Sequence, residues 1–195
     1  KWEEHGFEIF IGSQSDEVFW KNFKSKVGDV DVILDDGGHT YDQQIITTEC
    51  MLGSIRDGGL LVVEDTHTSY MEGFGPQRYS FIEYVKQLID KVNYRFGKFA
   101  DKEAEDRIWS IEILESVVAF KVNHKASSLK SEPTDNGGKN DQATDFRYED
   151  ISAIGSFSKI AQRFNFLKNI PLAKKLAILL RSQIVNRTFI AKKYF

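Results

Sequence analysis

The chain has 195 residues, of which 41% are hydrophobic and 13% aromatic, so it can form one hydrophobic core but not two large domains. No apolar stretch approaches the ~20 residues of a membrane span, and the single cysteine, Cys50, excludes an intramolecular disulfide framework and indicates a reducing, cytoplasmic compartment. The net charge of −3 combines an acidic segment, residues 1–150 with a charge of −12, and a basic tail with nine Lys or Arg and no acidic residue.

Hydrophobic alternation and helical periodicity predict the secondary structure of the acidic segment. In chain order, the first predicted elements are a strand over 7–11, a helix over 16–23 that Asp16 can cap, and a strand over 29–35. A helix over 41–54, which a turn at 56–59 ends, and a strand over 60–64 follow. The last elements are a glycine-containing loop over 66–75, an amphipathic helix over 79–94, and two closely connected strands over 108–114 and 116–122. The last two strands are typical of a hairpin near a sheet edge.

The alternation of strands and helices predicts a doubly wound α/β sheet that ends in an antiparallel hairpin. We expect this domain to occupy residues 1–124, a flexible linker to occupy 125–150, and a basic helical tail to occupy 151–195, with Pro171 near the start of a helix. The sequence contains no G-x-G-x-x-G loop, so we expect the sheet to lack N-terminal strands that lie upstream in a longer protein.

The basic tail has two interpretations. Its Lys and Arg residues among Leu and Ile could form an amphipathic helix that touches an anionic membrane or a nucleic acid. Alternatively, the tail could dock on the acidic segment or on a partner subunit, because opposite charges attract. We favour docking, and therefore expect no nucleic-acid partner and allow for a homo-oligomer.

Two predicted strands each end in a pair of acidic residues, which are Asp35, Asp36, Glu64 and Asp65. Ligands in open α/β sheets bind outside the carboxyl ends of the strands, so these four carboxylates would surround one crevice, with His39 beside them. Clustered carboxylates repel one another unless a cation lies between them. A bound hard metal ion is the simplest explanation.

Each of these residues also has a structural interpretation. The first acidic pair could cap the helix that begins near residue 41. The second pair could be solvated loop carboxylates, and His39 could be a hydrogen-bonded loop histidine. We interpret His67, in the following loop, as a structural residue or a substrate contact and leave it out of the metal site.

Three motifs occur in the order and spacing of a known family. They are Gly-Ser-Gln-Ser-Asp at 12–16, Asp-Asp-Gly-Gly-His at 35–39, and Glu-Asp-Thr at 64–66 followed by Thr-Ser-Tyr at 68–70 and Gly-Phe-Gly at 73–75. With them, residues 7–122 resemble the metal-dependent O-methyltransferases of macrolide-sugar biosynthesis, of the mycinamicin and macrocin type, and are similar to cephalosporin hydroxylase-like proteins. The chain departs from the family at Ser13, where the family has aspartate, and at Gly38, where it has serine.

The resemblance implies a Rossmann-like class I methyltransferase sheet and a role for each motif residue. It assigns Asp36, Glu64 and Asp65 as magnesium ligands and His39 as the general base. It assigns Gln14, Asp16 and Asp35 to the binding of S-adenosylmethionine, with the first two near the adenine. The family's glycine-rich loop and ribose-binding acid have no counterpart in this sequence, so we expect the chain alone to bind the cofactor poorly.

The resemblance also implies an activity. We expect a Mg²⁺- and S-adenosylmethionine-dependent O-methyltransferase that acts on a hydroxyl of a sugar or glycosylated natural product, a small hydroxylated acceptor. Two alternatives stay open: a hydroxylase-like metal enzyme of the same fold, and a non-catalytic assembly module that presents the basic tail.

Overall fold

A computed structural model describes residues 3–99, 101–131, 152–163 and 170–194. The chain divides into two compact units, Lys1–Thr134 and Asp135–Phe195. All of the predicted site residues lie in the first unit.

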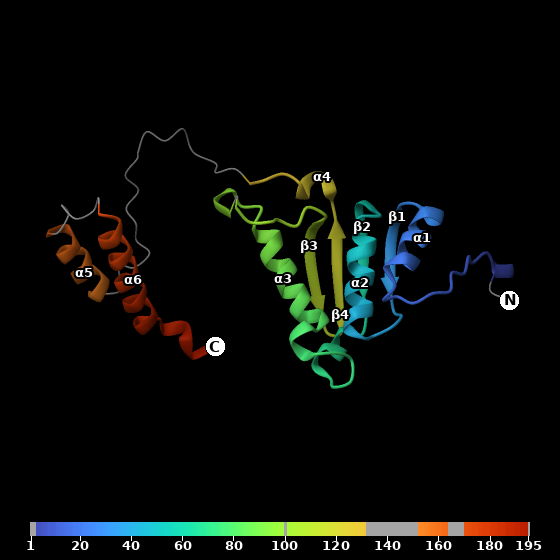
Figure 1. The fold of residues 1–195 in the computed structure, drawn as a ribbon, viewed down its shortest axis with the longest axis horizontal. Coiled ribbons are helices and arrows are strands. Elements are labelled where there is room, and N and C mark those ends of the chain that lie inside the picture. The colour runs from blue at the N-terminus through green and yellow to red at the C-terminus, as the bar shows by residue number, and fades with distance from the viewer. Residues whose placement is uncertain (1–2, 100, 132–151, 164–169, 195) are drawn as a thin grey trace. The chain divides into compact units, whose positions relative to one another are not determined.

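The first unit contains a four-stranded mixed sheet (Figure 1). Its strands are β1 (Val30–Asp35), β2 (Ile55–Val63), β3 (Ile108–Leu114) and β4 (Val117–Val122), in the spatial order β1-β2-β4-β3. β1 and β2 are parallel, whereas β4 is antiparallel to both β2 and β3. The predicted parallel pair and the predicted hairpin at the sheet edge are therefore confirmed.

The longer helices of this unit match the predicted ones and are α1 (Glu17–Val27), α2 (Tyr41–Leu52) and α3 (Phe81–Asn93). A short helix that was not predicted, α4 (His124–Ser127), follows β4. Asp16 caps α1, because its Oδ1 accepts a hydrogen bond from the Val18 amide at 2.8 Å. Thr40 and Gln43 form a capping box at the start of α2.

The hydrophobic core lies between one face of the sheet and helices α2 and α3. Its buried members are Leu52, Ile55, Leu61, Val63, Phe81, Val85, Leu88, Ile108, Val118, Phe120 and Val122. On the other face of the sheet, Val32 and Leu34 are each 61% exposed. Among the described residues, helices therefore cover only one of the two faces that a doubly wound sheet would have covered.

Two local predictions were wrong. Residues 7–11 alternate in hydrophobicity but form no strand, and Ile11 is 94% exposed. A strand needs a hydrogen-bonded neighbour, and in the described residues β1 pairs with β2 alone. The predicted turn at 56–59 lies inside β2, as an irregularity between the pairs Val30↔Ile55 and Val32↔Leu60.

The second unit contains helices α5 (Ser152–Arg163) and α6 (Pro171–Thr188), which contact each other. Pro171 occupies the first turn of α6, where its missing amide hydrogen costs no hydrogen bond. Most of the predicted linker lies outside the described residues, but its beginning differs from the prediction, because α4 covers His124–Ser127. A search of the described helices finds none with the length and apolar character required to cross a bilayer.

Candidate metal and acceptor site

The site lies where β1 and β2 end side by side. Asp35 pairs with Val63, and the Glu64 amide donates a hydrogen bond to the Asp35 carbonyl at 2.9 Å. The parallel pairing therefore aligns the residues that follow the two strands. Asp36 and the loop to His39 follow β1, whereas Glu64 and Asp65 follow β2.

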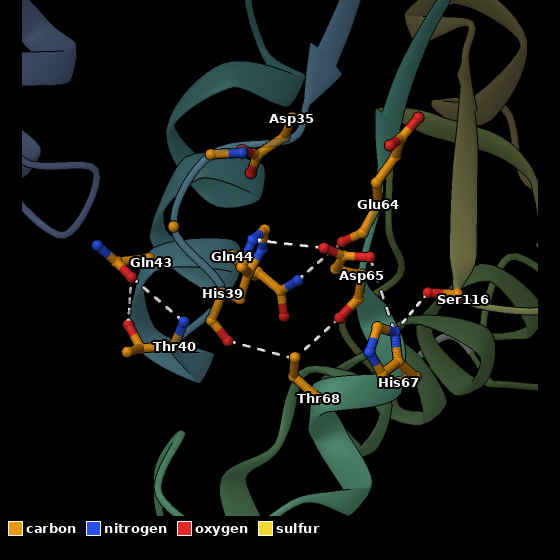
Figure 2. A network of polar contacts seen from close by, with 12 residues as sticks. Asp35, His39, Thr40, Gln43, Gln44, Glu64, Asp65, His67, Thr68 and Ser116 are labelled. Atoms are coloured by element: carbon orange, nitrogen blue, oxygen red, sulfur yellow. Dashed lines mark hydrogen bonds and ion pairs between the residues drawn. The ribbon is translucent and has the colours of Figure 1, made fainter.

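This alignment brings three of the predicted side chains together. One potential ligand atom from each of Asp36, His39 and Asp65 lies within 4.8 Å of the others. His39 Nε2 is 3.4 Å from Asp65 Oδ2, and both side chains are partly exposed (Figure 2). A polar molecule can therefore reach the cluster from solvent.

Glu64 does not join this cluster. Its carboxylate points away from His39 in Figure 2, while its backbone carbonyl accepts a hydrogen bond from Gln44 Nε2 at 3.0 Å. The Gln44 side chain is buried, so its hydrogen bond fixes the backbone at the end of β2 to helix α2. A metal-binding role for Glu64 requires a different side-chain rotamer.

Asp35 fixes the shape of the loop that carries Asp36 and His39. Its Oδ1 accepts hydrogen bonds from Gln14 Nε2 at 2.6 Å and from the Gly37 amide at 3.3 Å, and the Gly38 amide donates to Gln14 Oε1. Burial raises the pKa of the Asp35 carboxyl, although the hydrogen bond from Gln14 opposes that shift. Its Oδ2 is buried without a hydrogen-bond partner among the described residues.

The predicted cofactor-side residues thus have structural contacts of their own. Gln14 and Asp35 bind each other and the loop at 37–38, and Asp16 caps α1. The Gln14 carbonyl accepts a hydrogen bond from Trp20 Nε1 at 2.8 Å, which attaches this segment to α1. These contacts place Gln14 and Asp35 next to the loop that carries Asp36 and His39, and the role of all three residues toward a cofactor remains a prediction.

Three residues that were given no role from the sequence hold the loop after β2 in place. Thr68 Oγ1 lies 3.2 Å from the His39 carbonyl and 2.9 Å from the Asp65 carbonyl, so it can donate to either. The buried Tyr41 hydroxyl donates to the Met71 carbonyl at 2.9 Å. Ser116, in the β3–β4 turn, forms a 2.6 Å hydrogen bond with His67 Nδ1.

The cluster has donor chemistry that fits a hard divalent cation. Asp36 and Asp65 offer carboxylate oxygens, the ligand type that Mg²⁺ prefers. Two protein carboxylates leave coordination positions for water or for hydroxyl groups of an acceptor. The residues present therefore fit a bound Mg²⁺.

Comparison with known proteins gives sequence relatives of one kind, although no family model matches the chain. The chain is 38% identical over 88 residues to L-olivosyl-oleandolide 3-O-methyltransferase of Streptomyces antibioticus. It is 32% identical over 90 residues to mycinamicin VI 2''-O-methyltransferase of Micromonospora griseorubida. The matches cover 42% and 43% of this chain and 23% of each relative, so the matched part spans about a quarter of the relatives' length.

Solved structures give the same fold. The MycE methyltransferase from the mycinamycin biosynthetic pathway, in complex with Mg and SAH, matches with a TM-score of 0.56 and 22% identity over 75% of this chain and 38% of that chain. The complex that also holds mycinamycin VI matches with a TM-score of 0.51 and 23% identity over 68% of this chain and 34% of that one. The predicted resemblance is confirmed: the chain has the fold of the matched part of the MycE methyltransferase, and its sequence relatives are named as O-methyltransferases of the macrolide and tetracenomycin type.

Proposed function

We propose that this chain carries the metal-binding and acceptor-binding part of a Mg²⁺- and S-adenosylmethionine-dependent O-methyltransferase. Its acceptor is a hydroxyl of a sugar or glycosylated natural product. The observation that carries the proposal is the convergence of Asp36, His39 and Asp65 at the ends of two parallel strands. The relatives support it, because each is named as an O-methyltransferase of a glycosylated compound.

Asp36 and Asp65 would hold the metal ion, and Glu64 could join them after a change of rotamer. When bound, Mg²⁺ supplies a Lewis acid that makes an acceptor hydroxyl more acidic and a template that orients it. S-adenosylmethionine supplies an activated methyl group, which leaves the protein to position the acceptor oxygen in line with it. Gln14, Asp16 and Asp35 are the proposed cofactor side of the site.

His39 is the proposed general base. Its Nε2 faces the cluster, so this ring nitrogen can take the proton of an acceptor hydroxyl that lies between His39 and the carboxylates. The Thr68 hydroxyl beside the His39 carbonyl fixes the backbone that carries the ring. Proton transfer of this kind typically contributes about 10²–10⁴-fold to the rate.

The proposed acceptor is small and rich in hydroxyl groups, because neighbouring hydroxyls can occupy neighbouring coordination positions. The His39 and Asp65 side chains are partly exposed and Asp36 is exposed, so an acceptor can reach the cluster from solvent. The homo-oligomer, the partner of the basic tail and the cytoplasmic location stay predictions.

The test is a calorimetric titration of Mg²⁺ into the wild-type chain and into the Asp36→Asn and Asp31→Asn variants. Asp31 is the matched control, because it lies on the same strand at the opposite end, where it pairs with Arg56 on the surface. We expect Asp36→Asn to lower the Mg²⁺ affinity at least about tenfold, because it removes a charged ligand, and Asp31→Asn to leave it unchanged. Equal affinity in the two variants would remove Asp36 from the metal site.

A second titration tests the cofactor. S-adenosylmethionine is added, with and without Mg²⁺, to the 195-residue chain and to the full product of its gene. An activity assay follows, in which a glycosylated acceptor is added and S-adenosylhomocysteine is measured. We expect the full product to release S-adenosylhomocysteine and to stop doing so when EDTA removes the metal. Release that continues unchanged in EDTA would overturn the role of the metal, and a full product that binds no S-adenosylmethionine would favour the assembly module.

A further inference from the structure

Two residues of the first unit have an unusual backbone conformation. Among the non-glycine residues that the structure describes, only Asp65 and Ser116 have positive φ angles, of 54° and 63°. The left-handed conformation costs an L-residue about 1–2 kcal/mol, and the cost is smaller for Asp and Asn. Such a conformation persists where the surrounding structure determines it, and it concentrates at functional sites.

These two residues are connected, although 51 positions separate them in the sequence. The amide of Thr66, the residue after Asp65, donates a hydrogen bond to the Ser116 carbonyl at 3.1 Å. The Ser116 hydroxyl forms a 2.6 Å hydrogen bond with His67 Nδ1. The same Nδ1 lies 3.8 Å from Asp65 Oδ1, so the contacts run from the hairpin turn to the carboxylate (Figure 2).

The Asp65 carboxylate consequently lies between two imidazole rings. His39 Nε2 faces its Oδ2 at 3.4 Å, and His67 Nδ1 faces its Oδ1. The His39 ring belongs to the loop after β1 and is placed to act on the acceptor. The His67 ring is held by Ser116 and is not among the three residues whose ligand atoms converge.

Ser116 is a suitable anchor, because the sheet fixes it on both sides. The turn lies between Leu114 and Val117, which pair with each other at the ends of β3 and β4. β4 pairs in turn with β2, with Val63 opposite Val118. The strand register therefore sets the position of the Ser116 backbone, including the carbonyl, and the hydrogen bond with His67 holds the hydroxyl.

We propose that Ser116 and His67 are positioning residues that hold the Asp65 carboxylate in the orientation in which it binds metal. The inference rests on the proposed function, because it requires Asp65 to be a metal ligand. Ser116 fixes the backbone after Asp65 through its carbonyl and the His67 ring through its hydroxyl. Neither residue belongs to the group of candidate metal ligands.

The experiment measures Mg²⁺ affinity by calorimetry in the full 195-residue chain, together with the urea midpoint of unfolding. Ser116→Gly accepts the left-handed backbone and keeps the carbonyl, but removes the hydroxyl. His67→Leu removes the ring nitrogens, whereas His67→Asn keeps an amide near the place of Nδ1. Loss of a group that orients a metal ligand typically lowers metal affinity 10–100-fold.

We expect Ser116→Gly and His67→Leu to weaken Mg²⁺ binding about tenfold, and His67→Asn to restore most of the affinity. If His67 had a purely structural role, His67→Asn and His67→Leu variants with equal urea midpoints would bind Mg²⁺ with equal affinity. Wild-type affinity in both Ser116→Gly and His67→Leu would overturn the positioning role and leave the proposed function intact. A wild-type chain that binds no Mg²⁺ would overturn the metal role of Asp65 and the positioning role with it.

Discussion

The left-handed backbone of Asp65 predicts the relative stability of two variants that lose the same carboxylate. Asp65 has φ 54° and ψ 32°, and its carbonyl accepts a hydrogen bond from the Thr68 amide at 3.2 Å. That bond does not need a side chain at residue 65. Asp65→Gly and Asp65→Ala therefore differ in little besides the cost of this backbone conformation.

The magnitude follows from two opposing terms. In ordinary helix or strand positions, alanine is more stable than glycine by about 0.5–1 kcal/mol, because glycine loses more backbone entropy on folding. In the left-handed region, alanine carries about 1–2 kcal/mol of strain that glycine avoids. The lost contacts of Asp65 with His39 and His67 are equal in both variants and cancel. We expect Asp65→Gly to be more stable than Asp65→Ala by about 0.5–1 kcal/mol.

Tryptophan fluorescence during urea unfolding is the appropriate measurement. Trp20 and Trp109 lie in the first unit, and the sequence has no tryptophan after residue 109, so the signal does not report the basic tail. Equal urea slopes would show that the two variants expose the same surface on unfolding. If Asp65→Ala were as stable as Asp65→Gly, the backbone of residue 65 would not be strained. The premise that the hairpin turn holds Asp65 in an unfavourable conformation would then be refuted.

Two further predictions concern contacts that support the sheet and the loops. Burial raises the pKa of the Glu105 carboxyl, but hydrogen bonds from Arg107 at 2.8 and 2.9 Å and its positive charge outweigh that effect and set the pKa below its usual value. A lowered pKa means that folding favours the ionised form, so this contribution is present above about pH 4.3 and is lost as the pH falls. Glu105→Gln should therefore destabilise the chain by about 1–3 kcal/mol at pH 7, because Arg107 keeps only its contact with Glu49, and by less as the pH falls through the folded-state pKa of Glu105; a pH-independent difference in urea midpoints would contradict this. Tyr41→Phe should cost about 1–2 kcal/mol, because the Thr68 and Met71 carbonyls lose their buried donor, and a urea midpoint equal to that of the wild type would show that water replaces it.

Hydrophobic periodicity along the sequence was sufficient to predict the strands and helices whose own apolar side chains pack in the core. The runs at 30–34 and 60–63 are β1 and the end of β2, and the apolar positions of 79–94 produced α3 with Phe81, Val85 and Leu88 in the core. Acidic residues after both runs predicted that carboxylates would meet, because parallel strands end at the same edge. The rule predicted the convergence of Asp36 and Asp65, but not that Asp35 would bind its own loop or that the Glu64 carboxylate would point away.

Other features depend on contacts that no local pattern contains. Residues 7–11 have the alternation of a strand, but alternation does not supply a hydrogen-bonded neighbour. Residues 56–59 have the composition of a turn, yet the pairing of Ile55 with Val30 draws them into β2. The contact between Ser116 and His67 spans 49 residues, and nothing in the sequence near either residue indicates it.

The strand order explains why a hairpin turn can support the site. β4 runs antiparallel to β2, so the turn that precedes β4 lies at the carboxyl end of β2, beside Glu64 and Asp65. A parallel neighbour would end at this edge and continue into a crossover connection, which is a longer segment than a two-residue turn. The short turn is fixed by the ladder on both sides, so its carbonyl and hydroxyl have little freedom to move. The hairpin at the edge of the sheet is thus also the element best placed to hold Asp65, the proposed metal ligand, in an unfavourable conformation.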